Sequence, residues 1–352
     1  MKNFKKMFLN LAVFILLIIL TFWLIFKDQE ITQIGSILAS VKIEYVILGT
    51  LVMFLYFLSD AFNVRRILNV FGEKISMSKS FKYSLIGFFF SAITPASTGG
   101  QPMEVYYMRK EKISTTYAIT ALLMQVCCYQ IVTITFGIIA GIINFDLLQN
   151  GLVPLFIFGI LINAVALTTM LICLFSKRTT RWLINLLIKI LKFFKYKKID
   201  ERIEKLEEGL EKYHAGSEFI KNNKSIFIKT LIVVVFQMLV YYSIPFFVCQ
   251  AFGVNNYTLL EIIGVQALLY GTVSGIPLPG AVGVSEGVFL NIYSGIFGAS
   301  ILSSAMLLNR GMNFYLFVII GCVLSIVNFI RFKNVPDEDE EELENNESFD
   351  DI

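Results

Sequence analysis

The amino-acid sequence predicts an all-α polytopic membrane protein, and three observations support this fold class. Hydrophobic residues make up 56% of the 352 residues, and charged residues only 16%. The hydrophobic residues occur in uninterrupted blocks of about 18 or more, the length at which a helix crosses the hydrocarbon core of a bilayer. Lys and Arg fall almost entirely on alternate connections between these blocks, as expected where basic loops stay in the cytoplasm.

The blocks define the predicted elements in chain order. Six full spans are predicted at residues 7–26, 45–64, 116–143, 151–175, 227–252 and 312–331. Two further hydrophobic stretches, 83–108 and 259–298, are broken by Pro and Gly and are predicted to be re-entrant hairpins. With both termini cytoplasmic, every Lys and Arg except Lys27, Lys42 and Arg310 lies on the cytoplasmic side. The same sidedness results if each hairpin is instead two full spans, so eight spans are the alternative.

Outside the spans, two polar segments have distinct compositions. Residues 1–334 are assigned to one transmembrane domain with a cytoplasmic insertion at 177–226. Within the insertion, 178–198 is predicted to form a basic amphipathic helix that binds an anionic membrane surface. The segment 335–352 is acidic, contains no base and is predicted to be a disordered tail.

The types of residue present exclude several classes of function. All five cysteines lie in hydrophobic blocks and there is one histidine, His214, so neither a disulfide framework nor a Cys/His metal site is expected. No cofactor and no nucleic-acid partner is expected either.

The two broken stretches form an internal repeat. When TPASTGGQPMEVYY is set above IPLPGAVGVSEGVF, Pro95 falls on Pro277 and Glu104 falls on Glu286. Three full spans lie between the stretches, so the two hairpins open to opposite sides of the membrane. Broken helices at matching positions of inverted repeats are typical of transporters that hold a substrate near the bilayer midplane.

The breaks themselves predict a site, because backbone freed from a helix at membrane depth must be packed in protein or face a wet cavity. After the first break, Gly99, Gly100 and Gln101 lead into Pro102, which leaves amides free to meet an anion such as a lipid phosphate. After the second, glycines permit a sharp turn, and Ser285 is expected to cap or to line the returning helix. The candidate substrate-binding residues are Asp60, Pro95, Gly99, Gly100, Gln101, Glu104, Arg109, Pro277, Pro279, Gly280, Gly283, Ser285, Glu286 and Arg310.

The charged members of this set have several interpretations. Glu104 and Glu286 either bind a cationic headgroup, take a coupling proton, neutralise Arg109 or Arg310, or are satisfied by local capping and pairing. Asp60 is either half of an internal ion pair with a nearby arginine or a contact to substrate.

The segments TPASTGGQPMEVYYMRK and GIPLPGAVGVSEGVF resemble those of the lysylphosphatidylglycerol synthase transmembrane-region family, a flippase-like domain found alone or fused to a synthase. This resemblance implies movement of a phospholipid, such as aminoacylated phosphatidylglycerol, to the outer leaflet, which confers resistance to cationic antimicrobial peptides. It also implies that Asp60, the turn from Pro95 to Glu104, Arg109, and Pro277 to Glu286 line a polar cavity. Because the chain ends shortly after its last span, we expect no synthase domain and no transferase activity in it.

The sequence therefore predicts a lipid translocase in a cell membrane, expected to be bacterial. Two alternatives are a membrane component of a phosphatidylglycerol lysyltransferase or other lipid-modifying system, and a non-transporting scaffold. A homodimer and a separate synthase partner are both compatible with the sequence.

Overall fold

The structure is a computed structural model that describes residues 31–148, 151–176 and 223–332, with isolated positions at 12–23, 181–182, 218 and 221. The predicted first span (7–26), amphipathic helix (178–198) and acidic tail (335–352) fall outside the described residues, apart from those isolated positions.

The described chain is helical throughout. Its α-helices are α2 (Ile31–Ala39), α3 (Ile43–Val70), α4 (Met77–Ile93), α5 (Gly100–Lys110), α6 (Thr115–Ile143), α7 (Val153–Phe175), α10 (Lys224–Tyr242), α11 (Ile244–Ala251), α12 (Leu259–Val273), α13 (Val284–Ile292), α14 (Ser294–Arg310) and α15 (Leu316–Phe332). The short helical turns are η1 (Pro95–Ser97), η2 (Phe145–Leu148), η3 (Pro279–Ala281) and the π-helical turn η4 (Gly311–Tyr315).

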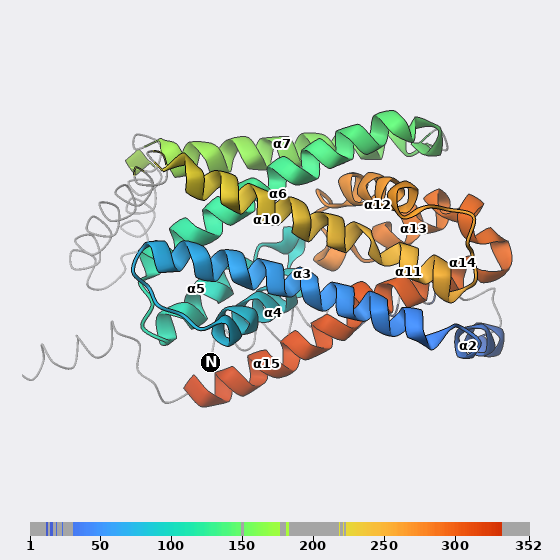
Figure 1. The fold of residues 1–352 in the computed structure, drawn as a ribbon, viewed down its shortest axis with the longest axis horizontal. Coiled ribbons are helices and arrows are strands. Elements are labelled where there is room, and N and C mark those ends of the chain that lie inside the picture. The colour runs from blue at the N-terminus through green and yellow to red at the C-terminus, as the bar shows by residue number, and fades with distance from the viewer. Residues whose placement is uncertain are drawn as a thin grey trace, which may run out of the picture.

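Among these residues, several helical segments are long and hydrophobic enough to cross a membrane. They are Ile43–Val70, Thr115–Ile143, Val153–Ile172, Lys224–Ala251 and Ser294–Phe332. Each contains or closely overlaps one of the predicted spans, which confirms an all-α polytopic membrane protein. The long helices run side by side, with α7 at one edge of the bundle and α15 at the other (Figure 1).

The two Pro- and Gly-broken stretches are helical hairpins rather than straight helices. In the first hairpin, α4 and α5 pack against each other and η1 joins them. In the second, α12 and α13 pack against each other around η3. The hairpins start from opposite ends of the bundle, and their tips, η1 and η3, are in contact (Figure 1). The predicted pair of inverted broken elements is therefore present, and neither stretch contains a single continuous crossing helix.

One boundary prediction is wrong, and the error matters for the site. The second hairpin ends at Ile292, and the chain then runs as one helical segment, Ser294–Phe332, through α14, η4 and α15. The predicted span 312–331 is only the second half of this segment. Arg310, assigned above to an extracellular connection, lies inside the bundle and is only 8% exposed. The reason is that α14, although rich in Ser and Gly, is held by its neighbours α2, α11 and α13.

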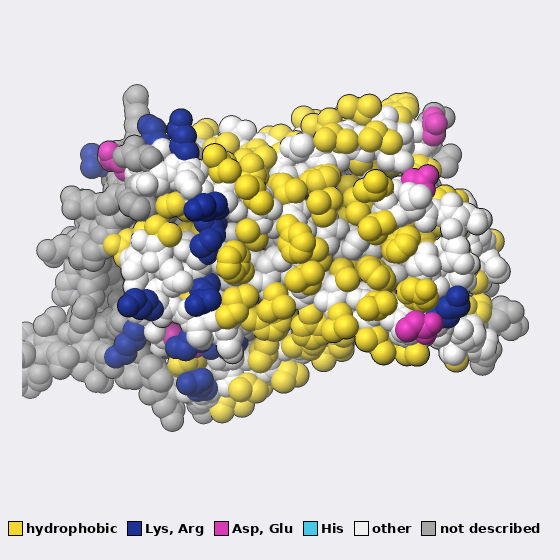
Figure 2. Space-filling view, viewed as in Figure 1, with side chains coloured by type: hydrophobic (Ala, Val, Ile, Leu, Met, Phe, Trp, Pro, Cys, Tyr) yellow, Lys and Arg dark blue, Asp and Glu magenta, His cyan; other side chains and the backbone are white. Residues whose placement is uncertain are grey.

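Hydrophobic packing surrounds both hairpins. One cluster of buried residues includes Ile86, Phe89 and Tyr107 of the first hairpin, and a second includes Leu268 and Phe289 of the second hairpin. The outer faces of the long helices are also hydrophobic, and Figure 2 shows them as a broad band across the molecule. Such a band is expected of a surface that faces lipid.

Lys and Arg side chains gather at one end of the face drawn in Figure 2, beside the hydrophobic band. This basic end is where α3 and α15 finish and where α4 and α10 begin (Figure 1). The first hairpin is built on the basic end, and the second hairpin on the opposite end.

Candidate functional site

The tips of the two hairpins share a backbone conformation. Ala96 and Gly280 each occupy the left-handed region, with φ of 52° and 58°, in the middle of a short helical turn. Each turn begins with a proline, Pro95 in the first and Pro279 in the second, and each proline follows an extended residue. Pro95 is therefore equivalent to Pro279, not to Pro277 as the sequence alignment suggested.

This shift of two residues changes the comparison of the two glutamates. Glu286 lies in the first turn of α13, where its Oε2 accepts a 2.7 Å hydrogen bond from the Gly283 amide. Glu104 lies later in α5, beyond the first turn. The prediction that the two glutamates occupy equivalent positions is therefore wrong, and each has to be interpreted separately.

A cavity of about 150 Å³ lies between the two tips. It is lined by Tyr56, Phe88, Ser91, Ala92, Ser97, Tyr129, Tyr241, Gln266, Leu269, Tyr270, Val273, Ser274, Ile276, Leu278, Gly280, Ala281, Ser285, Glu286, Phe289, Met306, Asn309, Arg310, Asn313 and Phe314. These residues come from α3, α4, α6, α10 and α12–α14 as well as from the tips, so most of the fold contributes to the cavity.

A buried ion pair forms one side of the cavity. Arg310 Nε donates to Glu286 Oε1 over 2.7 Å, and the two side chains are 9% and 0% exposed. The guanidinium also donates through Nη2 to the carbonyl oxygen of Gly280 at 3.1 Å, and it stacks on the ring of Phe314 with 4.2 Å to the ring centroid. Arg310 thus links α14 to the tip and to the return helix of the second hairpin, and its charge is balanced by Glu286.

Four tyrosines form another side of the cavity. The hydroxyl groups of Tyr129 and Tyr270 are hydrogen-bonded to each other across α6 and α12. Tyr241 packs edge-on against Tyr270 with 5.4 Å between ring centroids. The ring centroid of Tyr56 lies 5.6 Å from that of Tyr241. Aromatic rings with polar edges suit a surface that must contact both an apolar and a polar group.

Two asparagines in the polar lining have side-chain oxygens that accept no hydrogen bond. The Oδ1 atoms of Asn309 and Asn313 are buried and have no hydrogen-bond partner in the structure. Buried polar atoms are nearly always satisfied by protein or by water, so these two oxygens indicate a wet cavity or a place for a ligand donor.

The first hairpin contributes less to the cavity than the sequence predicted. Pro95 and Gln101 are exposed on the tip, and Gly99 is half-buried with its amide capped by Thr94 Oγ1 at 2.8 Å. Gly100 is buried, and a Cβ there would overlap the side chain of Ser91. None of Pro95, Gly99, Gly100 and Gln101 lines the cavity, whereas Gly280, Ser285, Glu286 and Arg310 all do.

The remaining predicted residues of the second hairpin surround the cavity without lining it. Pro277 is exposed, and Pro279 is buried as the first residue of η3. Gly283 has φ of 89°, a conformation that side chains rarely adopt, and it precedes the first residue of α13. The turn therefore requires glycine at this position, as predicted.

Asp60 lies in the middle of α3 and joins three other helices. Its Oδ2 accepts from Ser84 Oγ at 2.6 Å, and its Oδ1 accepts from Gln237 Nε2 at 3.1 Å and from Gln125 Nε2. Gln125 and Gln237 thus link helices by hydrogen bonds.

No described basic side chain pairs with Asp60: Arg66 instead donates a hydrogen bond to Thr230 Oγ1, at 2.5 Å. The ion-pair interpretation of Asp60 is therefore wrong, and Asp60 does not line the cavity.

Glu104 is buried between α4 and α5. A Cβ on Gly87 would overlap its carboxyl group, so Gly87 provides the space in which Glu104 lies. Its Oε2 is buried without a hydrogen-bond partner. Arg109 lies in the last turn of α5, toward the basic end and half-buried, and it does not line the cavity.

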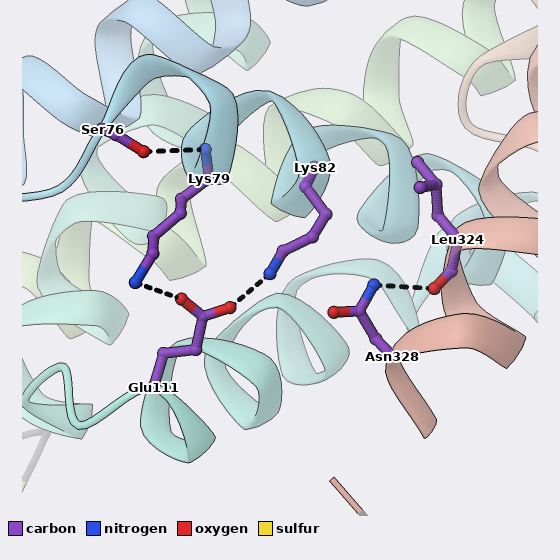
Figure 3. A network of polar contacts seen from close by, with 6 residues as sticks. All are labelled: Ser76, Lys79, Lys82, Glu111, Leu324 and Asn328. Atoms are coloured by element: carbon purple, nitrogen blue, oxygen red, sulfur yellow. Dashed lines mark hydrogen bonds and ion pairs between the residues drawn. The ribbon is translucent and has the colours of Figure 1, made fainter. Parts of the chain in front are cut away.

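The first hairpin is anchored at the basic end by an ion cluster. Glu111, directly after α5, pairs with Lys82 and with Lys79 Nζ at 2.7 Å, both on α4 (Figure 3). Burial raises the pKa of the Glu111 carboxyl, but hydrogen bonds and charge from both lysines outweigh that effect, so its pKa lies below the usual value. The cluster holds the two helices of the hairpin together at their open end.

Several lining residues that the structure brings together are not among the predicted site residues. The four tyrosines come from four different helices, and Gln266 shares α12 with Tyr270. An aromatic residue inside a hydrophobic span has no pattern that separates a cavity wall from a core. Asn309 and Asn313 had a usable signal, because they flank Arg310 by one and three residues within a membrane-spanning segment.

Comparisons with known proteins agree with this architecture. A model of the family described as the lysylphosphatidylglycerol synthase TM region matches residues 7–321. Over 329 residues the chain is 21% identical to a UPF0104 membrane protein of Archaeoglobus fulgidus, and the match covers 89% of this chain and 95% of that protein. The family match spans both hairpins and every helix that lines the cavity. The chain thus belongs to the lysylphosphatidylglycerol synthase transmembrane-region family.

Proposed function

We propose that the protein is a lipid translocase that passes a phospholipid headgroup through the cavity between the two hairpin tips. The acyl chains stay in the bilayer while the headgroup crosses. The observation that carries this proposal is the polar cavity itself, with the buried Arg310–Glu286 pair where two inverted hairpins meet.

The physical argument starts from the cost of polar groups at membrane depth. A broken helix and a buried ion pair each cost several kcal/mol, by order of magnitude, if they face hydrocarbon. The hairpin tips place both features around one small cavity, which offers a polar headgroup a site inside the bundle. The Arg310 guanidinium suits a headgroup phosphate, and Glu286 and the tyrosines suit its polar or cationic part.

The orientation follows from the basic end. We propose that this end faces the cytoplasm, since Lys and Arg are retained there. The first hairpin then enters the membrane from the cytoplasm and the second from outside, as re-entrant elements. An aminoacylated phosphatidylglycerol in a bacterial cell membrane is the substrate that the family suggests, with resistance to cationic peptides as the consequence. The predicted amphipathic helix, 178–198, would bind the anionic cytoplasmic surface.

The test is a lipid-movement assay with the purified full chain in proteoliposomes. Fluorescent phosphatidylglycerol in the inner leaflet is protected from dithionite until it is moved outward. Arg310→Gln and Glu286→Gln are expected to slow movement by about tenfold or more, since each removes a charge-assisted contact worth about 1.5–3 kcal/mol.

The control is Glu261→Gln, because Glu261 is an exposed carboxylate that caps α12 and Gln can replace it as a cap. Its rate is expected to equal that of the unmodified protein. Equal rates for the Arg310, Glu286 and Glu261 variants would remove the cavity from the mechanism.

The family description also suggests a role in lipid modification. The carboxylate of the cavity lining, Glu286, is already held by Arg310 and by the Gly283 amide, so we propose that this chain transports lipid rather than modifying it. Formation of lysylphosphatidylglycerol by the purified chain, supplied with charged tRNA and phosphatidylglycerol, would contradict this proposal.

A further inference from the structure

Beyond the headgroup cavity, we propose that Asp60 and Glu104 form a proton-binding carboxyl pair, and that its protonation is coupled to the lipid movement proposed above. The pair is separate from the cavity, since neither residue lines it. The coupling rests on the proposed function, whereas the binding of a proton does not.

The two carboxyl groups, from α3 and α5, pack against one face of α4. Ser84, which donates to Asp60, and Gly87, whose missing side chain makes room for Glu104, are three residues apart on α4. Residues three apart on a helix are neighbours on its surface. Asp60 and Glu104 therefore contact neighbouring positions of α4.

The hydrogen bonds around the two groups differ. Asp60 accepts three donors, one on Oδ2 and two on Oδ1, as an ionised carboxylate does. Glu104 is 8% exposed, its Oε2 has no partner, and no described Lys or Arg pairs with it. Ionisation of Glu104 would therefore place a buried charge near a second carboxyl group, with no donor at Oε2, which costs several kcal/mol by order of magnitude. The arrangement favours one proton shared by two carboxyl groups, held on Glu104.

The glutamines allow Asp60 to accept a proton as well. Gln125 and Gln237 are 7% and 1% exposed, both donate to Asp60, and the Oε1 atom of each is buried without a partner. An amide has both donors and an acceptor. If Asp60 takes a proton, one amide can turn so that its oxygen accepts the new O–H. The site can thus satisfy Asp60 in its charged or its neutral form.

Other titratable groups near the pair are few in the described part of the chain. Tyr56, one turn earlier on α3, is the titratable neighbour of Asp60. The elements α4, α6 and α10 contribute only the hydroxyl and the two amides already described. Arg66 lies farther along α3 and is bonded to Thr230 instead. Proton exchange is therefore determined mainly by the two carboxyl groups.

A proton on this pair would affect the position of the first hairpin. Asp60 belongs to α3, Ser84 and Gly87 belong to α4, and Glu104 belongs to α5. When both carboxyl groups are charged, their repulsion favours separation of α5 from α3 and α4, and a shared proton removes that repulsion. Since η1 at the tip of this hairpin contacts η3 beside the cavity, such a movement would reach the cavity wall.

The first experiment measures the proton directly. Infrared spectra of the full chain in lipid nanodiscs are recorded at neutral pH for the unmodified protein, Glu104→Gln and Glu261→Gln. A carboxylic-acid C=O band is expected in the unmodified protein and in Glu261→Gln, and it is expected to be lost in Glu104→Gln. Gly87→Ala, whose methyl would overlap the Glu104 carboxyl, is expected to shift the band. A band that is absent from the unmodified protein, or unchanged in both the Glu104 and Gly87 variants, overturns the proposal.

The second experiment measures coupling in proteoliposomes across a range of pH. Lipid movement by the unmodified protein is expected to change by up to about tenfold per pH unit in the titrating range, as for a single proton. Glu104→Gln and Asp60→Asn are expected to make the rate independent of pH. Dependence on sodium in place of pH would overturn the assignment to a proton. No lipid movement at any pH, with the infrared band present, would refute the proposed function and leave the proton site standing.

Discussion

The Arg310–Glu286 pair makes a quantitative prediction about stability. Glu286→Gln keeps the shape of the side chain and its cap on Gly283, but it leaves the Arg310 guanidinium without its counterion. Both side chains are almost completely buried, at 9% and 0% exposure, so water screens the loss very little. Removing one partner of such a pair typically costs about 3–5 kcal/mol. We expect a loss of this size in the free energy of unfolding.

A double-mutant cycle separates the ion pair from other effects. Arg310→Met alone leaves Glu286 charged and buried, and it is expected to destabilise the protein as strongly as Glu286→Gln. The double variant has no buried charge at this position, so it is expected to be more stable than either single variant.

The assay is denaturant titration of the purified protein in detergent micelles, with Glu261→Gln as the exposed control. The structural reasoning would be refuted if each single variant lost less than about 1 kcal/mol, or if the losses added in the double variant, because contacting charges must couple.

Three further predictions test other parts of the fold. Glu111→Gln should flatten the fall in stability at low pH. Because the pKa of Glu111 is lowered in the folded state, its ion pairs contribute about 1 kcal/mol above about pH 4, and this contribution is lost as the pH falls through the folded pKa. An acid titration of unfolding would show the difference. Gly159→Ala should lower the thermal midpoint by an amount equivalent to about 1–3 kcal/mol, because its Cβ would lie 2.5 Å from a backbone oxygen of α12. The control, Gly295→Ala, would have no atom within 4 Å of its Cβ and should be neutral or stabilising. Thr94→Val should cost about 1 kcal/mol in denaturant titration, since the Gly99 amide loses its cap; an unchanged midpoint would contradict this role.

The positions of the two breaks could be predicted from the residues alone, but which residue of one break corresponds to which residue of the other could not. Clustered Pro and Gly disfavour a continuous helix, so both breaks were predictable. The correct match of Pro95 with Pro279 depends on loop length: α4 ends one residue before Thr94, whereas α12 ends at Val273, well before the tip. Matching the letters Pro and Glu gave an alignment that is two residues out, because sequence alone does not show where backbone angles repeat.

Arg310 shows why the cavity differs from the predicted set of residues. The last predicted span began at residue 312, which left Arg310 in an extracellular connection. The packing of α14 against other helices keeps this segment inside the bundle, where Arg310 meets Glu286. In contrast, Asp60 and Glu104 lie inside the bundle but outside the cavity, and their functional role stays a prediction.

Composition and the length of the hydrophobic blocks establish a helical membrane protein, since only helices of that length satisfy their backbone within lipid. Proline and glycine likewise establish the two breaks, because their backbone constraints are local. The set of residues that line the cavity was decided only by the tertiary structure, because these side chains come from α3, α4, α6, α10 and α12–α14, which are far apart in the chain. The partners of the carboxyl groups also depend on how these helices pack: Glu286 pairs with Arg310, whereas Asp60 accepts from amides and Glu104 lies against Gly87. Packing is a property of the assembled bundle.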